Sequence, residues 1–396
     1  MYKDSSAAYN RSVSAAACGR YDVNTVRESL ARVLEPLGGL DWVEPGMTIA
    51  IKVNLIAARA PEKAATTNPV LVTELCRMLT ARGAEVIVGD SPGGTFTAGH
   101  LENVYRICGL TTVEEAGARL NRDFSIRDAV FQEAVSLKTF SYTGWLDAAD
   151  CIIDFCKLKT HAMMKMTCAV KNLFGTIPGT TKPEYHMRFP DISDFANLMI
   201  DLNEYFRPRL CIVDAVDCME GNGPTSGTPR HMGLLLASES PYDIDMAAAH
   251  LIGLGLADID TLRQANLRGL GPASFEEVTC VGEALAPYVI GDFKTDIKRM
   301  GVDFSLGEGP FGKLSAVIFN AALKTRPQVR PKECVGCAKC ADVCPAKAIS
   351  MVRKKPSIDR GKCIRCFCCQ EFCPVGAMKV HHTWAGNLIQ KISNRG

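Results

Sequence analysis

The sequence contains no apolar run of the roughly 18–20 residues that a helix needs to cross a bilayer. It also lacks a Gly-x-Gly-x-x-Gly turn after a strand-like segment and a Gly-x4-Gly-Lys-Ser/Thr loop, the fingerprints of dinucleotide and nucleoside triphosphate sites. An excess of one charge is missing too, because 45 Lys and Arg residues nearly balance 43 Asp and Glu residues. These absences argue against a membrane span, a nicotinamide or P-loop enzyme, and a general nucleic-acid binder.

Cysteine, in contrast, is abundant: there are 18 in 396 residues, and eight of them lie in two matching runs near the C-terminus. The runs read Cys334-x2-Cys337-x2-Cys340-x3-Cys344-Pro345 and Cys363-x2-Cys366-x2-Cys369-x3-Cys373-Pro374. This spacing is typical of bacterial two-cluster ferredoxins, in which the fourth cysteine of each run binds the cluster of the other run. We therefore predict two 4Fe–4S clusters, one held by Cys334, Cys337, Cys340 and Cys373, the other by Cys363, Cys366, Cys369 and Cys344.

Two other interpretations of these cysteines are open. Structural zinc sites also use paired cysteines, but four ligands per zinc ion explain neither the third evenly spaced cysteine of each run nor the prolines. The doublet of Cys368 and Cys369 permits a slipped register, although only Cys369 reproduces the spacing of the first run. We expect iron–sulfur clusters, with Cys368 as a spare thiol beside the second one.

The ten cysteines outside the runs show no paired motif. Several of them, such as Cys151 and Cys211, lie in strand-like segments, and cysteine is among the most buried residue types in reducing compartments. We expect core thiols and a cytoplasmic protein. A redox sensor is a weaker alternative because no paired motif is present.

Residues 1–300 alternate short apolar segments with helical patterns. Helices are expected from a cap at Asn68 to about Gly83 and over 192–206. Strands buried on both faces and alternating with helices predict a mostly parallel, doubly wound α/β sheet. The expected strands cover 12–17, 47–56, 84–89, 151–156, 210–213, 233–237 and 277–281. After this α/β domain we expect a linker and packing segment over 301–328, an α+β ferredoxin-like domain with two clusters over 329–381, and a tail over 382–396.

Polar residues follow several of these strands, and ligands of doubly wound sheets bind beyond the carboxyl ends of the strands. Lysines and turn amides together can hold a phosphate or carboxylate, although a solvated basic loop and helix caps are plainer explanations. His161 is the best general-acid candidate, because nearby lysines would lower its proton affinity, but a lone histidine is more often structural. The candidate catalytic residues are His161, Lys159, Asp90 and Asp214, and the candidate cofactor-binding residues are Lys52, Asn54, Ser91, Gly93, Lys157 and Lys171.

A family resemblance rests on five segments of the α/β domain. They are Ile51-Lys52-Val53-Asn54-Leu55, Gly89-Asp90-Ser91-Pro92-Gly93, Lys157-Leu158-Lys159-Thr160-His161, Lys171-Asn172-Leu173-Phe174-Gly175 and Asp214-Ala215-Val216. With them the chain resembles a widespread prokaryotic family of iron–sulfur proteins known as a domain of unknown function. The resemblance covers most of residues 10–300, and many members carry an appended ferredoxin domain. It implies membership but no settled activity.

Two functional hypotheses follow. The first is a cytoplasmic, oxygen-sensitive oxidoreductase, to be handled under anaerobic conditions, that passes electrons through two clusters to an anionic small-molecule substrate or an unseen cofactor in the α/β domain. The alternative is an electron-carrier module that docks a partner redox enzyme and has no catalysis of its own. The Lys, Asp and His residues at strand ends favour the enzyme, and the missing cofactor fingerprint favours the carrier. Both require a redox partner protein, and neither involves nucleic acid or a membrane span.

Overall fold

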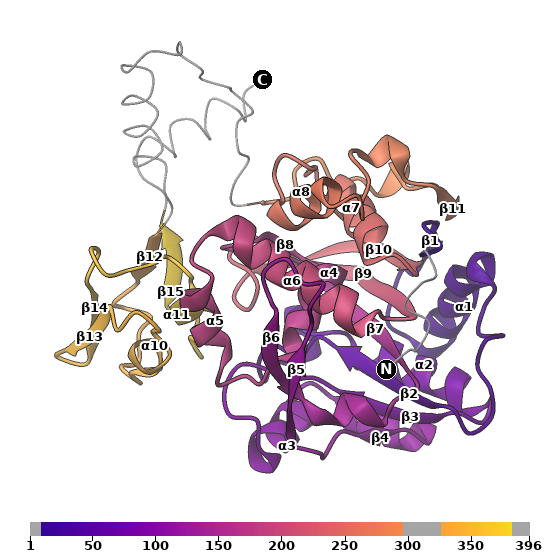
Figure 1. The fold of residues 1–396 in the computed structure, drawn as a ribbon, viewed down its shortest axis with the longest axis horizontal. Coiled ribbons are helices and arrows are strands. Elements are labelled where there is room, and N and C mark those ends of the chain that lie inside the picture. Colours follow the sequence, from indigo (N-terminus) through magenta and orange to yellow (C-terminus); the bar gives the residue numbers. More distant parts are fainter. Residues whose placement is uncertain (1–8, 296–325, 382–396) are drawn as a thin grey trace, which may run out of the picture. The chain divides into compact units, whose positions relative to one another are not determined.

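The computed structural model (Figure 1) describes residues 9–295 and 326–381. The chain divides into two compact units, Met1–Thr295 and Asp296–Gly396. The expected tail over 382–396 and most of the expected linker over 301–328 lie outside the described residues.

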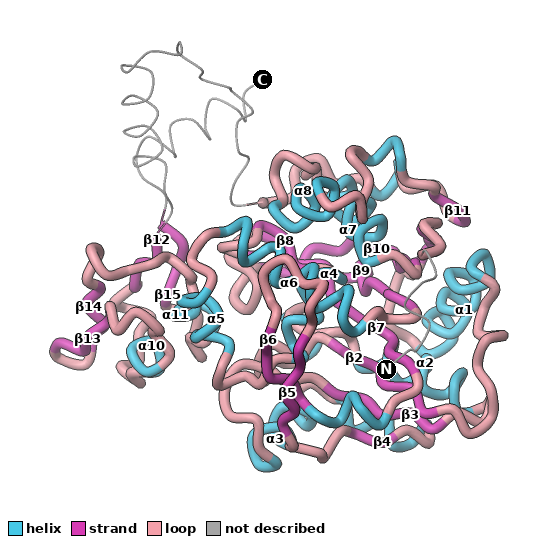
Figure 2. The backbone as a smooth tube through the Cα atoms, viewed as in Figure 1, coloured by secondary structure: helices cyan, strands magenta, loops and turns pink. Residues whose placement is uncertain are grey.

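A nine-stranded sheet organises the first unit, in the order β11-β1-β10-β9-β7-β2-β3-β4, with β8 paired to β7 (Figure 2). Neighbouring strands from β9 through β7, β2 and β3 to β4 are parallel, whereas β10 runs antiparallel to both β1 and β9. The predicted mostly parallel α/β sheet is confirmed. The strands are β1 (Val13–Ala17), β2 (Thr48–Val53), β3 (Glu85–Gly89), β4 (Arg119–Leu120), β7 (Cys151–His161), β8 (Lys165–Thr167), β9 (Leu210–Glu220), β10 (Thr228–Ser238) and β11 (Cys280–Gly282). A separate hairpin pairs β5 (Ile126–Val130) with β6 (Thr139–Thr143).

Helices cover both faces of this sheet. Alternate residues of β2 show the two faces, because Ile49 and Ile51 pack in one apolar core with α1 and α2, while Ala50 packs in another with α6. A third core lies between α7 and strands β9 and β10. The helices of this unit are α1 (Val23–Leu34), α2 (Pro69–Thr80), α3 (Ala98–Ile107), α4 (Ala169–Asn172), α5 (Lys182–Arg188), α6 (Ile192–Phe206), α7 (Pro241–Leu251) and α8 (Asp260–Leu267).

Local chemistry sets several helix ends. The side chain of Asn68 accepts a hydrogen bond from the Val70 amide, and Pro69 is the first residue of α2. Asp191 caps α6 in the same way by accepting from the amides of Ser193 and Asp194. No helix within the described ranges is long and apolar enough to cross a membrane.

Two strands are longer than predicted, which changes where several polar residues lie. Strand β7 continues to His161, where β8 pairs with its end, and β9 continues to Glu220, where β10 pairs with its end. Hydrogen bonds to these partner strands extend β7 and β9 although their last side chains are polar or charged. Lys157, Lys159 and Asp214 therefore lie inside strands and not in loops that follow them.

The second unit is a small α+β domain with ferredoxin-like repeats. Strand β12 (Arg326–Val329) pairs with β15 (Met378–His381), and β13 (Ile349–Val352) pairs with β14 (Lys355–Ile358), all antiparallel. One short helix follows the start of each cysteine run, α10 (Lys339–Asp342) in the first and α11 (Cys368–Glu371) in the second. The predicted ferredoxin-like class of this domain is confirmed.

Candidate metal centre and buried polar network

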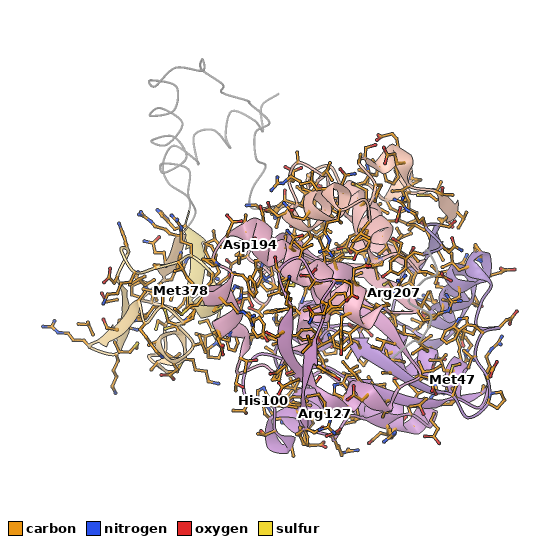
Figure 3. The ribbon with its side chains drawn as sticks, in the orientation of Figure 1. Met47, His100, Arg127, Asp194, Arg207 and Met378 are labelled. Carbon is orange, nitrogen blue, oxygen red and sulfur yellow. The ribbon has the colours of Figure 1, made fainter. Side chains whose placement is uncertain are left out.

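A cavity in the second unit is lined by four cysteines. Cys334, Cys337 and Cys340 come from the first run, and Cys373 comes from the second. The other lining residues are apolar and include Met351, Pro356 and Met378, the last of which is labelled in Figure 3. The structure therefore places Cys373 with the first run, in the crossed arrangement that the spacing predicts.

The other four run cysteines also lie near one another. Burial raises the pKa of Cys369, and the charges of Cys366, Cys363, Cys340 and Cys344 raise it further, so Cys340 of the first cavity also lies close enough to act on it. Burial likewise raises the pKa of Cys363, with smaller contributions from Cys366 and Cys344. Thiols held this way are deprotonated when a metal binds them, because the cation outweighs the cost of burial. We call these two groups the first and the second cysteine set.

Backbone amides donate to one cysteine of each set. The amide of Ala348 lies 3.3 Å from Sγ of Cys344, and that of Ala377 lies 3.2 Å from Sγ of Cys373. Both contacts span four residues, so the two halves of the domain repeat the same local geometry. Amide hydrogen bonds to ligand sulfur stabilise the thiolate and tune cluster potentials. Four thiols around one apolar cavity, one of which accepts such an amide hydrogen bond, are a donor set that suits an iron–sulfur cluster.

Cys368 lies beside the second set. It is buried, and its thiol donates a hydrogen bond to the sulfur of Cys366, which lowers the pKa of Cys366. The same contact raises the pKa of Cys368 itself. Cys368 therefore contacts one cysteine of the second set, and its role as a spare thiol stays a prediction.

Three lysines of the first unit are buried side chains. Lys52 and Lys157 are 1% exposed and Lys159 is fully buried. An ammonium group removed from water costs several kcal/mol unless partners compensate it. The partners of these lysines therefore decide what the site can bind.

Lys52 lies at the centre of one hydrogen-bonded network. Its ammonium group is 2.8 Å from a carboxylate oxygen of Asp90 and donates to the carbonyl of Val53 at 2.7 Å. A β-carbon at Gly175 would collide with both Asp90 and Lys52, so only glycine fits where this pair contacts the backbone. The network continues through Asn172, whose side-chain oxygen accepts from Lys52 and whose amide donates to Asp154 at 2.5 Å.

Lys159 joins the same network from β7. Its ammonium group donates to the side-chain oxygen of Asn54 and to the carbonyl of Ala65, both at 2.7 Å. Asn54 in turn donates to Asn172 at 2.9 Å. We call the connected residues Lys52, Asn54, Asp90, Asp154, Lys159 and Asn172 the Lys52 network.

Lys157 and Asp214 form a second buried pair at 2.8 Å. The hydroxyl of Tyr21 accepts from Lys157 and donates to Asp214, each at 2.9 Å. Asp214 also accepts from the amide of Asn68, the cap residue of α2. The negative charge of Asp214 therefore compensates Lys157 and holds the start of a helix.

The expected anion-binding amides are engaged within the protein. The amide of Ser91 donates to the carbonyl of Gly175 at 3.1 Å, and that of Gly93 donates to the carbonyl of Ile56 at 3.0 Å. Backbone hydrogen bonds to other segments of the chain therefore hold loop 90–94.

The two remaining predicted residues have other contacts. Nδ1 of His161 accepts from the amides of Met163 and Met164, both at 3.1 Å, which assigns the ring proton to Nε2. The ammonium group of Lys171 lies 5.7 Å from the centre of the Phe174 ring. The hydrogen bonds thus gather Lys52, Asn54, Asp90 and Lys159 in one network and Lys157 with Asp214 in another.

Three participants were not among the predicted residues. Asp154 had a visible signal, since it is a carboxylate in the middle of the apolar strand segment 151–156. Asn172 stands directly after Lys171 in one of the family segments, but Lys171 was the residue predicted to bind a cofactor. Tyr21 precedes the cap of α1 and carries no signal of this role in the sequence.

Comparisons with known proteins match both units. A family described as a domain of unknown function (DUF362) matches residues 49–250, and one described as a 4Fe-4S dicluster domain matches residues 326–374. A thylakoid-associated protein of Synechocystis sp. is 31% identical over 303 residues, which cover 75% of this chain and 91% of that protein.

Two solved structures are similar at low identity. One is a protein from Thermotoga maritima, with 13% identity and a TM-score of 0.35 over 53% of each chain. The other is the lactate racemase apoprotein from Thermoanaerobacterium thermosaccharolyticum, with 12% identity and a TM-score of 0.38 over 62% of this chain and 57% of that one. This chain therefore spans little more than half the length of either.

Proposed function

The chain belongs to the DUF362 family of domains of unknown function and carries a 4Fe-4S dicluster domain, and from this premise we propose a two-cluster electron-transfer protein. It would exchange single electrons with a redox partner protein. The observation that supports the proposal is the cavity lined by Cys334, Cys337, Cys340 and Cys373, within the part of the chain that matches the dicluster family.

The residues of the chain have defined tasks in this proposal. The eight thiolates hold the clusters, and bound clusters supply one-electron oxidation and reduction. The amides of Ala348 and Ala377 donate to ligand sulfurs, which offsets the negative charge that a reduced site gains. Apolar side chains such as Met351 and Met378 line the inner part of the first set, while Cys337 stays exposed.

A second candidate function is an oxidoreductase that reduces an anionic substrate at the Lys52 network. Buried ionisable residues favour it, because such groups cluster at functional sites. However, Asp90 and Asp214 already neutralise two of the three lysines, and Asn54 and Ala65 bind the third. An incoming anion would have to displace these partners, so the geometry favours the carrier.

Reoxidation of the reduced protein separates the two candidates. The cluster-loaded chain is reduced without oxygen and mixed either with the small-molecule fraction or with the protein fraction of an extract of the source cells. The carrier predicts that only the protein fraction restores the visible absorbance quickly. The enzyme predicts fast recovery with small molecules, lost in a Lys159→Met variant that keeps its iron.

We also propose a reducing compartment such as the cytoplasm. Eight thiols of the first unit are buried and unbridged, as is typical of proteins kept reduced. A thiol-specific label applied in intact cells, followed by mass spectrometry, tests this: the proposal requires Cys280, the exposed thiol of this unit, to be recovered in reduced form.

A further inference from the structure

The nearly balanced charge of the whole chain conceals a basic second unit. Between Arg326 and His381 the sequence has twelve lysines and arginines but four aspartates and glutamates. Thiolates on bound clusters offset part of this surplus without reversing its sign at the surface. The location of the charges therefore bears on what the unit meets.

The first cysteine set reaches the surface beside apolar side chains. Cys337 is exposed, and Val335 and Val375, which line the same cavity, are 65% and 46% exposed. In the second set, Cys344 and Cys369 are buried. Electron transfer slows steeply with distance, so a partner exchanges electrons fastest at the edge near Cys337.

Basic residues lie next to this edge, two of them in sequence and two in a turn that packs on the first run. Lys332 and Lys339 are exposed and flank the cysteines of the first run. The exposed turn at Arg353 and Lys354 packs on the same run, because a β-carbon at Gly336 would lie 2.8 Å from the carbonyl oxygen of Lys354. We call Lys332, Lys339, Arg353 and Lys354 the basic rim.

No carboxylate between Arg326 and His381 compensates the charges of the basic rim. Among the described residues, none of the four forms an ion pair with a carboxylate, whereas Arg330 and Lys379 both contact Glu333. Uncompensated surface charges around an apolar patch attract a partner of opposite charge during diffusional encounter and orient it on the surface.

We infer that this face docks an acidic one-electron carrier protein, whose carboxylates surround an exposed apolar cofactor edge. The inference rests on the proposed function and specifies its partner. Partner carboxylates pair with the basic rim while Val335 and Val375 meet the apolar edge. An oxidised cluster held by the first cysteine set would then accept one electron from the reduced carrier, with no bond made or broken. Nucleic acids and anionic membranes share the carrier's charge but have no cofactor to offer the edge near Cys337.

Stopped-flow electron transfer from a photoreduced, acidic bacterial ferredoxin tests the inference. The cluster-loaded full chain is compared with Lys339→Gln/Lys354→Gln and with the matched control Arg360→Gln/Lys362→Gln, whose exposed charges lie before the second run. At low salt the rim variant should lower the bimolecular rate constant about tenfold and flatten its salt dependence, since steering is electrostatic. A binding titration under the same conditions should show the same difference, and the control should change neither reading appreciably.

Three results would overturn the inference. The two double variants could slow transfer equally, the wild-type rate could be independent of salt, or the rim could bind phosphatidylglycerol vesicles while the acidic ferredoxin does not bind. Failure of the proposed function is distinguishable, because the chain would then accept no electrons from dithionite either.

Discussion

At the scale of one residue, Cys373 shows that cysteines distant in sequence can lie around the same cavity. It lies in the second run, yet its side chain lines the cavity of the first. A serine there should therefore alter the paramagnetic resonance of the cluster held by Cys334, Cys337 and Cys340, while Cys344→Ser should alter the other signal. Spectra of both reduced variants, made without oxygen, check this.

Cys368→Ser is the control for that experiment. Its thiol touches Cys366 but belongs to neither set of four, so both signals should persist with only a small shift. If Cys344→Ser instead disturbed the signal of the first run, the crossed assignment would be wrong.

Asp154 makes a prediction about pH. Burial raises its pKa to about 8, more than Lys52 and the hydrogen bond from Asn172 can offset. The folded protein thus holds this proton more tightly than the unfolded chain, whose carboxyl titrates near 3.8. The contribution of Asp154 to the free energy of unfolding should therefore fall as pH rises from about 4 to 8 and then level off.

Asp154→Asn should remove that part of the slope, because an amide keeps the shape but does not titrate. Urea unfolding at pH 5.5 and pH 8 should show the parent losing more stability than the variant, by on the order of 1 kcal/mol or more. Asp245, whose pKa burial raises to about 7, titrates in both proteins, and its charge also raises the pKa of Asp154, so the difference between the proteins includes the interaction of the two carboxyls. Equal losses in the two proteins would contradict the assignment.

At the scale of elements, helix ends were easier to predict than strand ends. Asn68 and Pro69 announce the start of α2 through side-chain chemistry that is local in sequence, and α6 spans the predicted 192–206. The ends of β7 and β9 depend on pairing with β8 and β10, which are separate segments of the chain. The strand ends predicted from apolar residues alone therefore came too early.

Asn68→Ala should destabilise the first unit by about 1 kcal/mol, because the amide of Val70 loses its acceptor. Thr97→Ala is a matched control, since Thr97 stands at the same cap position of α3 without a side-chain capping bond. Chemical unfolding of the two variants measures the difference. Equal destabilisation would show that the cap bond of Asn68 contributes nothing of its own.

For the whole molecule, the sequence was informative wherever chemistry repeats at fixed spacing. The cysteine runs predicted both the ferredoxin-like unit and the placement of Cys373 beside the first run. The α/β class followed from alternating strands and helices, but the antiparallel β10 did not, because strand order depends on contacts distant in sequence. The residue types at the strand ends could not show that Asp90 and Asp214 neutralise the lysines, or that these residues would divide between two networks.

The central claim is that one chain holds two 4Fe–4S clusters, and quantitative iron and acid-labile sulfide analysis tests it most directly. Protein made and purified without oxygen should contain about eight iron atoms and about eight sulfides per chain. An intact preparation that contains zinc in place of iron, or only about four iron atoms, would contradict the account.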